Sequence, residues 1–183
     1  MEKTTQLANR YGLNTKVFQY KGYTKESTAL MNIDFANLSE INVSGDAVWA
    51  TGGQSHGNIV AFYNPLGGTF KLSTQIMTPE LLALMAGKIL EDGETTVVFE
   101  NTAESVIPNY FVITSETVWQ DKDGATYAEN LTFHKAFAKR ALNITYDGSG
   151  DPVSCDIEFE LGQDDSGKVL TIVKALKQTE QAA

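Results

Sequence analysis

The feature that most constrains the fold is a stretch near the C-terminal end in which apolar and polar side chains alternate. Val153, Cys155, Ile157, Phe159 and Leu161 alternate with Ser154, Asp156, Glu158 and Glu160. Because successive side chains of a strand point to opposite faces of a sheet, the pattern predicts a strand with one dry and one acidic face. Burial of the five apolar side chains would contribute on the order of 10 kcal/mol before ordering costs.

Similar strand-forming segments recur along the chain, with turn-forming residues such as Gly45-Asp46 and Asn64-Pro65 between them. The predicted strands are Lys16–Tyr20, Ala29–Phe35, Ile41–Val43, Ala47–Ala50, Asn58–Tyr63, Thr69–Ile76, Thr95–Glu100, Asn109–Gln120, Thr126–His134, Ala136–Tyr146, Val153–Leu161 and Lys168–Ala175. Many short strands separated by turns are typical of an antiparallel β-sandwich or barrel, so a mainly β fold is expected.

One flanking α-helix is predicted at about 78–87. Thr78 suits the N-cap, Pro79 suits the first helical position, and Gly87 can close the helix in the left-handed conformation. The apolar residues have the spacing of a core-facing stripe, at Leu81, Leu84 and Met85.

The length of 183 residues fits one domain. We expect an N-terminal arm at 1–15, a single β-sandwich or barrel domain at 16–175, and a flexible C-terminal tail at 176–183. The start of the chain lacks the apolar core of a signal peptide, and the longest apolar run, Leu81 to Ala86, is far shorter than the ~20 residues of a membrane span. No membrane association is therefore expected.

The charge balance bears on the partners. The net charge is −9, from 23 acidic and 14 basic residues, which argues against a protein that grips nucleic acid through its phosphates. The same balance is compatible with a protein that DNA passes without sticking.

Several motifs could suggest chemistry, and each has a simpler interpretation. Residues 162–168 have the glycine and lysine spacing of a phosphate-binding loop, but Val169 replaces the required Ser or Thr and a strand follows instead of a helix. Asp121, Asp123 and Gly124 resemble part of a calcium loop but fit a hairpin tip better.

The remaining candidates are weaker. Cys155 is the single cysteine and lacks a metal-binding companion in its motif, and neither His56 nor His134 lies in a motif with a nucleophile or metal partner. Asp156, Glu158 and Glu160 could act as paired carboxylates, yet carboxylates along one strand face are more often a solvated surface. We therefore expect no catalytic residue, no cofactor and no metal, and we do not expect an enzyme.

Two stretches resemble the tail tube proteins of long-tailed phages. The first comprises residues 45–53, the 67–72 strand and the helix at 78–84, and the second comprises residues 142–145, 148–152, 157–161 and 167–172. The resemblance implies a β-sandwich or barrel with a flanking helix. It also implies homo-hexameric rings that stack into a hollow tube, enclose a tape-measure protein, join other tail proteins and later conduct double-stranded DNA.

On this hypothesis the chain is a structural protein of the virion, located in the phage tail and in the host cytoplasm during assembly. Candidates for contacts between rings are the 1–15 arm, the Thr51–Gly57 loop and the 176–183 tail. Carboxylates in the bore would repel DNA and keep its transit fast, so Asp156, Glu158 and Glu160 are the candidate lumen-facing residues.

The alternative function is a β-sandwich binding module of a phage tail or baseplate, which would bind carbohydrate or a receptor. Trp49, Trp119 or Tyr110 could supply the aromatic surface of a glycan site, although the apolar alternation around Trp119 favours the core for that residue. An enzyme of an unrecognised type is the third possibility, and converging carboxylates in a closed pocket would favour it.

Overall fold

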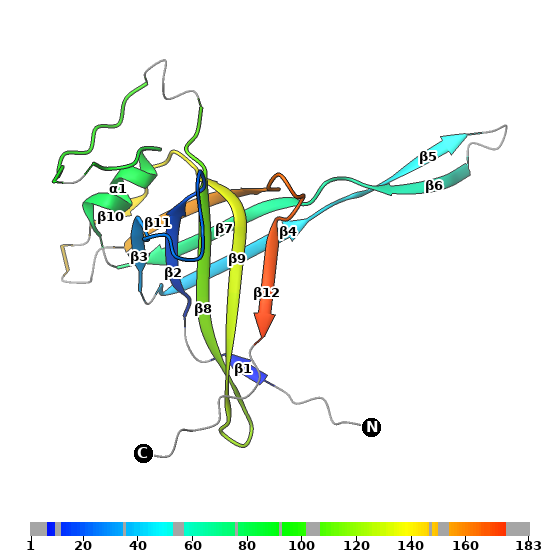
Figure 1. The fold of residues 1–183 in the computed structure, drawn as a ribbon, viewed down its shortest axis with the longest axis horizontal. Helices are drawn as coiled ribbons and strands as arrows, with labels where there is room; N and C mark the ends of the chain where they lie inside the picture. The colour runs from blue at the N-terminus through cyan, green and yellow to red at the C-terminus, as the bar shows by residue number, and fades with distance from the viewer. Residues whose placement is uncertain are drawn as a thin grey trace.

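A computed structural model describes residues 7–9, 12–34, 36–52, 57–75, 77–91, 93–101, 107–146, 148–149 and 154–174. The fold is mainly β with one short helix, as the sequence predicts (Figure 1). Within the described residues no helix has the length and apolarity needed to cross a membrane.

Ten strands form the main antiparallel sheet, in which the path of neighbours is β3-β2-β8-β9-β11-β7-β4. β1 pairs with β8, β10 with β11 and β12 with β9, while β5 and β6 form a separate two-stranded sheet. The strands are β1 (Leu7–Asn9), β2 (Asn14–Gln19), β3 (Met31–Ile33), β4 (Leu38–Ser44), β5 (Ala47–Gly52), β6 (Gly57–Tyr63), β7 (Gly67–Thr74), β8 (Phe111–Asp121), β9 (Thr126–Ala138), β10 (Ile144–Thr145), β11 (Ser154–Gly162) and β12 (Leu170–Lys174).

The main sheet bends over its own inner face and so makes two layers. In Figure 1 the upright strands β8 and β9 cross the strands β11, β7 and β4. Phe70 of β7 and Phe133 of β9 stack with ring centroids 4.5 Å apart, although β11 lies between their strands. Strands two places apart in a flat sheet are separated by about 9.5 Å, so the inner face must be concave for these rings to meet.

The alternation in β11 produces the predicted dry face. Cys155, Ile157, Phe159 and Leu161 are all buried, and Phe159 stacks at 6.2 Å from Phe70. The first apolar residue of the predicted strand, Val153, lies outside the described residues. The inner face also includes Phe70 and Leu72 of β7, Val17 of β2, Phe111 and Ile113 of β8, and Phe133 of β9.

The helix α1 (Pro79–Met85) covers part of this core, and its ends are as predicted. The side chain of Thr78 accepts a hydrogen bond from the Leu81 N–H, and Gly87 has a φ of +77°. Leu81, Ala83, Leu84 and Met85 are buried. The Cys155 Sγ donates to Met85 Sδ at 3.4 Å, which ties the helix to β11.

The main sheet is not closed into a barrel. In the described part of the chain, β3 pairs only with β2 and β4 pairs only with β7. The two end strands are joined by the link 34–37, whose Asn37 N–H donates to Ser73 O at 2.8 Å.

Two predicted strands need correction. No strand forms at Thr95–Glu100, where Val98 and Phe99 are exposed and no neighbouring strand pairs with the segment. Strand-forming composition alone does not make a strand, because the backbone groups need a partner.

The sequence predicts two separate strands at Thr126–His134 and Ala136–Tyr146. In the structure β9 instead continues without a break through Lys135 to Ala138. The edge of β9 that faces away from β8 pairs first with β12 and then with β11, so the strand pairing along this edge is nearly continuous. Only β10 remains of the second predicted strand beyond that point. The stretch expected as an N-terminal arm contains β1 and the start of β2, both of which pair with β8.

The stacked phenylalanines give a direct test of the fold. Phe133 is fully buried, so Phe133→Ala should reduce the free energy of unfolding by about 3–5 kcal/mol through lost burial and the cavity left behind. Chemical denaturation followed by circular dichroism measures this loss. The control Phe99→Ala removes a side chain that is 44% exposed and should change stability far less, and equal losses would contradict the assignment of the core.

Candidate assembly surface

A two-stranded sheet stands away from the rest of the fold (Figure 1). Its described side chains include four that are large, apolar and exposed, Val48, Trp49, Phe62 and Tyr63. β5 and β6 pair antiparallel, with a register shift between Ala50 and Thr51. At the base the Asn64 N–H donates to Asp46 O at 2.8 Å. We call this sheet the ribbon.

The described side chains of the ribbon include large apolar groups exposed on both of its faces. Val48 lies opposite Phe62, and Trp49 lies opposite Ala61. Since neighbours along a strand point to opposite faces, Val48 and Phe62 occupy one face and Trp49 the other. Trp49 is 53% exposed, Phe62 58% and Tyr63 84%. A two-stranded sheet alone is marginally stable in water, so a partner that buried these apolar side chains would stabilise the ribbon.

The composition of the ribbon is that of an interface core. From Ala47 to Phe70 the chain contains no Lys, Arg, Asp or Glu. Exposed strands usually carry charges that prevent pairing with other molecules, whereas the centres of interfaces are poor in charge and rich in aromatic residues. Both strands are predicted from the sequence, but their separation from the main sheet as an uncharged ribbon is not. The missing charge over this range is the signal that could have revealed it.

β4 and β12 of the main sheet each have one edge that pairs with no described strand. In the described chain β4 pairs on one side with β7, and β12 pairs on one side with β9. Ile172 and Val173 of β12 are 51% and 54% exposed. Unpaired edges expose backbone N–H and C=O groups that a further strand can bind.

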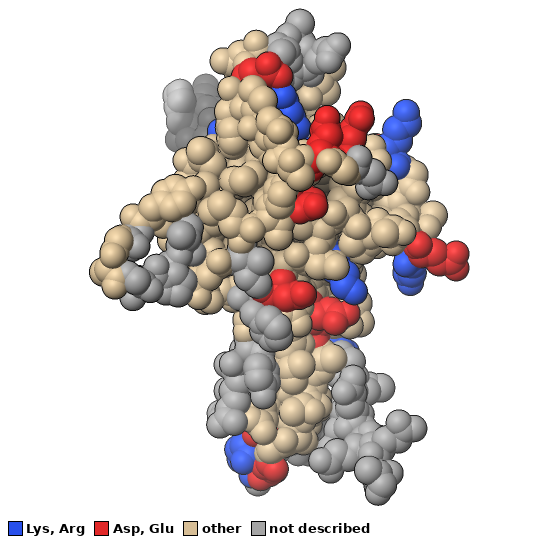
Figure 2. Space-filling view, turned by 90° about the vertical axis from the view of Figure 1, so that its left-hand side faces the viewer, with Lys and Arg blue, Asp and Glu red and all other residues tan. Residues whose placement is uncertain are grey.

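The acidic residues predicted for the lumen share the outer face of β11 but do not form a purely acidic surface. Asp156 accepts a hydrogen bond from Asn143 Nδ2 at 3.3 Å, and Glu158 forms an ion pair of 3.4 Å with Lys139. Lys71 of β7 lies directly opposite Glu158, and Glu160 is half-buried opposite Phe137. Figure 2 shows acidic and basic side chains scattered over a largely uncharged surface on the side it displays. A place for this face in a bore stays a prediction.

The segment with phosphate-loop spacing is a hairpin turn. Asp164 Oδ1 accepts hydrogen bonds from the Ser166 and Lys168 N–H groups, at 2.9 Å and 2.8 Å. Val169 is buried and leads into β12, so no helix N-terminus is available for a phosphate. The hydrogen bond from the Lys168 backbone, followed by those from Ser166, holds the pKa of the Asp164 carboxyl below its usual range.

His134 joins this turn to the sheet. Its Nε2 lies 2.7 Å from Thr171 Oγ1, and its Nδ1 lies 3.5 Å from Asp164 Oδ2. The three side chains line an open groove with Lys21 and Lys168. The contacts tie β9, β12 and the turn together. His56, the other histidine, lies outside the described residues.

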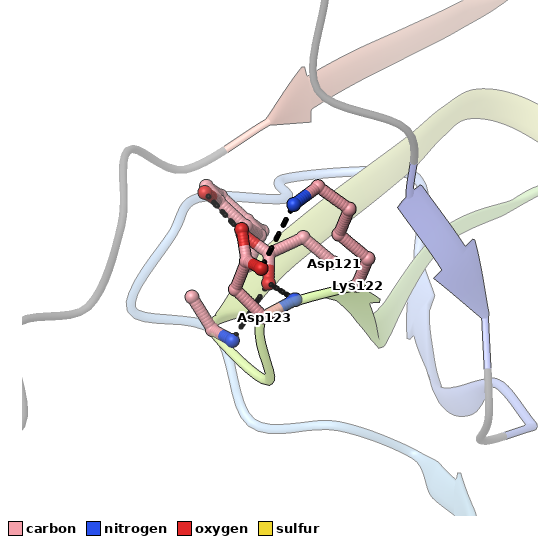
Figure 3. Close-up of polar contacts among 5 residues, drawn as sticks. Asp121, Lys122 and Asp123 are labelled. Carbon is pink, nitrogen blue, oxygen red and sulfur yellow. Dashed lines mark hydrogen bonds and ion pairs between the residues drawn. The ribbon is translucent and has the colours of Figure 1, made fainter.

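The Asp121 loop is a hairpin tip, as expected, and Figure 3 shows how its side chains are used. Asp121 Oδ1 accepts from the N–H groups of Asp123 and Ala125, both at 2.9 Å, and Tyr127 OH donates to Oδ2 at 3.3 Å. Lys122 pairs with Asp123 at 2.9 Å. Desolvation, followed by the charge of Asp121, raises the pKa of Tyr127. Among the described residues no group of three His, Cys, Asp or Glu side chains is arranged to bind a metal.

The aromatic residues considered for a glycan site do not lie together. Trp49 is on the ribbon, whereas Trp119 is half-buried on β8 with Lys174 Nζ 5.8 Å from its ring centroid. Tyr110 is 38% exposed, and Lys135 Nζ lies 4.7 Å from its ring centroid and 5.1 Å from that of Tyr20. The buried Cys155 thiol has a pKa raised mainly by its burial.

Comparisons with known proteins identify no family for the chain. No family model matches it, and no curated protein matches it. Among solved structures, a crystal structure of Hcp protein is similar at 10% sequence identity and a TM-score of 0.34, over 88% of this chain and 97% of that one. At this TM-score the two folds superpose poorly, and the similarity says nothing about the function of this chain.

The Asp164 turn gives a pH-dependent prediction. Because folding lowers the pKa of the Asp164 carboxyl below its usual value of 3.8, the carboxylate stabilises the fold above about pH 4 and loses this contribution as the pH falls through the folded pKa. Asp164→Asn keeps the acceptor oxygen of the turn but removes the charge.

The melting temperature of the wild type should therefore exceed that of Asp164→Asn near neutral pH, and the two should converge as the pH falls below about 4. Asp165→Asn changes the net charge equally in the same turn and serves as the control. A constant difference between wild type and Asp164→Asn across this range would contradict the prediction.

Proposed function

We propose that this chain is a structural protein that assembles with copies of itself into stacked rings, forming the tail tube of a phage. The observation that carries the proposal is the ribbon, which exposes aromatic side chains on both faces and lacks charged residues. Most soluble oligomers are built from copies of one chain, so we take a second copy as the partner that covers this surface.

The sheet edges support the same proposal. β4 and β12 are different edges of one molecule, so a contact that joins an edge of one copy to another surface of the next is heterologous and can propagate into rings or filaments. Strand pairing between copies would satisfy the backbone groups that these edges leave open.

The net charge of −9 supports a role as a conduit. A wall rich in carboxylates would repel the phosphates of double-stranded DNA and release it quickly. Under this proposal Asp156, Glu158 and Glu160 face the bore, and the protein performs no catalysis and needs no cofactor. Its place is the virion tail, with tape-measure and other tail proteins as partners.

Self-assembly is the first property to test. Sedimentation velocity over a range of concentrations and negative-stain electron microscopy should show rings or tubes of the purified chain. A chain that remains a single copy at millimolar concentration, or that instead binds glycans as a stable monomer, would overturn the proposal and favour a binding module.

A charge placed on the ribbon should block assembly without unfolding the protein. Phe62→Lys removes apolar area worth about 1.5–3 kcal/mol in each contact that buries it, and it adds an ammonium group to that contact. We expect at least about a tenfold rise in the concentration needed for assembly. The melting temperature of the single copy should change little, because Phe62 lies outside the main core.

The matched control is Tyr146→Lys, which also replaces an exposed aromatic residue, one that is 76% exposed and lies away from the ribbon. It should assemble as the wild type does. Equal loss of assembly in both variants would show that added charge alone, and not the ribbon surface, is responsible.

A further inference from the structure

A recess lies where β4 meets the lower part of the β8–β9 hairpin. The hairpin extends past the crossing strands, and β4 is the crossing strand on the side of the hairpin tip (Figure 1). The recess has a volume of about 350 Å³. We call it the corner. Its lining includes Ser39, Ile41, Thr117, Trp119, Glu129 and Leu131.

One side of the corner is a strand edge without a partner. β4 is hydrogen bonded to β7 along its other edge, and the described residues supply no second neighbour. Leu38 at the start of β4 is 65% exposed. An extended segment that entered the corner could therefore continue the sheet beyond β4.

The corner also contains two polar atoms that the single copy leaves unsatisfied. Ser39 Oγ and Trp119 Nε1 are buried, and neither has a hydrogen-bond partner within the described part of the chain. Burial of a donor without an acceptor is unfavourable. A guest backbone would supply carbonyl oxygens for both groups, and side-chain rotamer changes of the kind common at interfaces would turn them toward the guest.

The charges around the corner are already balanced. Glu129, which is 7% exposed, pairs with Lys174 at 3.6 Å, and Lys174 lies over the Trp119 ring. Ile172 lies directly opposite Leu131, so it adds exposed apolar area to the same face. The corner is thus suited to an uncharged, extended and partly apolar guest.

We propose that the corner receives the ribbon of a second copy, which adds a strand to β4 and accepts hydrogen bonds from Trp119 Nε1 and Ser39 Oγ. The ribbon is extended, uncharged and apolar, and its strand β6 has seven residues, as many as β4. Because the ribbon and the corner are different surfaces, each copy offers one of each, and the contact can repeat along an assembly. The inference rests on the proposed function and names the surface that receives the ribbon.

The double variant Trp119→Phe with Ser39→Ala tests the hydrogen bonds. It removes both unsatisfied groups while keeping an aromatic ring and a small side chain. The concentration needed for assembly should rise at least about fivefold, while the melting temperature of the single copy should stay the same or increase. A purely structural role for these residues would lower the melting temperature and leave assembly unchanged, and that result would overturn the proposal. Ser44→Ala, on the same strand, is the control.

A crosslink tests the contact itself. Leu38→Cys and Ala61→Cys are made in separate chains, mixed, and treated with a short bis-maleimide; the native Cys155 remains because its thiol is buried. The mixture should give a crosslinked dimer that contains one chain of each variant, and each variant treated alone should give little crosslinked dimer of any kind.

The outcomes separate the two proposals. If the wild type assembles but the double variant assembles equally well and the mixed crosslink does not form, the corner contact is wrong while self-assembly stands. If the wild type stays a single copy at every concentration, both are overturned.

Discussion

The stacking of Phe70, Phe133 and Phe159 on one concave face is the interaction on which the rest of the structure depends. It lets a single antiparallel sheet cover itself, with α1 closing part of the core. A sheet that covers itself in this way without closing leaves one edge of each end strand unpaired. The edge of β4 and the exposed strand β12 are therefore consequences of how the core is built, and self-assembly is one way to satisfy them.

The ribbon stands in contrast to this core. It extends from β4 and returns to β7, two strands of the main sheet, so its base is held firmly while its own side chains gain little from the body. Its aromatic residues would be unfavourable in water if they stayed uncovered. A surface of this kind couples the stability of the protruding strands to the presence of a partner, so we expect the ribbon to be most rigid in an assembly.

Much of the fold could be predicted from local patterns. The alternation in 153–161 gave β11, and Thr78 with Pro79 gave the start of α1, because both patterns act over a few residues. The segment Thr95–Glu100 was predicted wrongly since its composition favours a strand but no neighbour pairs with it. The corner could not be predicted, because Ser39 and Trp119 are distant in sequence and line one recess only through the bend of the sheet. The placement of the acidic residues on one face of β11 was foreseeable, whereas Lys139 and Lys71 beside them depend on the register with β9 and β7.

The long strand β9 has a mechanical consequence. Along one edge it is bonded to β8, and along the other it passes from β12 to β11, so it belongs to both layers at once. Sliding of one layer over the other would have to shear the backbone ladder between β9 and β11, not merely separate side chains. A load applied to one layer would therefore be carried into the other through the main chain, and the body of the protein would respond to force as one stiff unit.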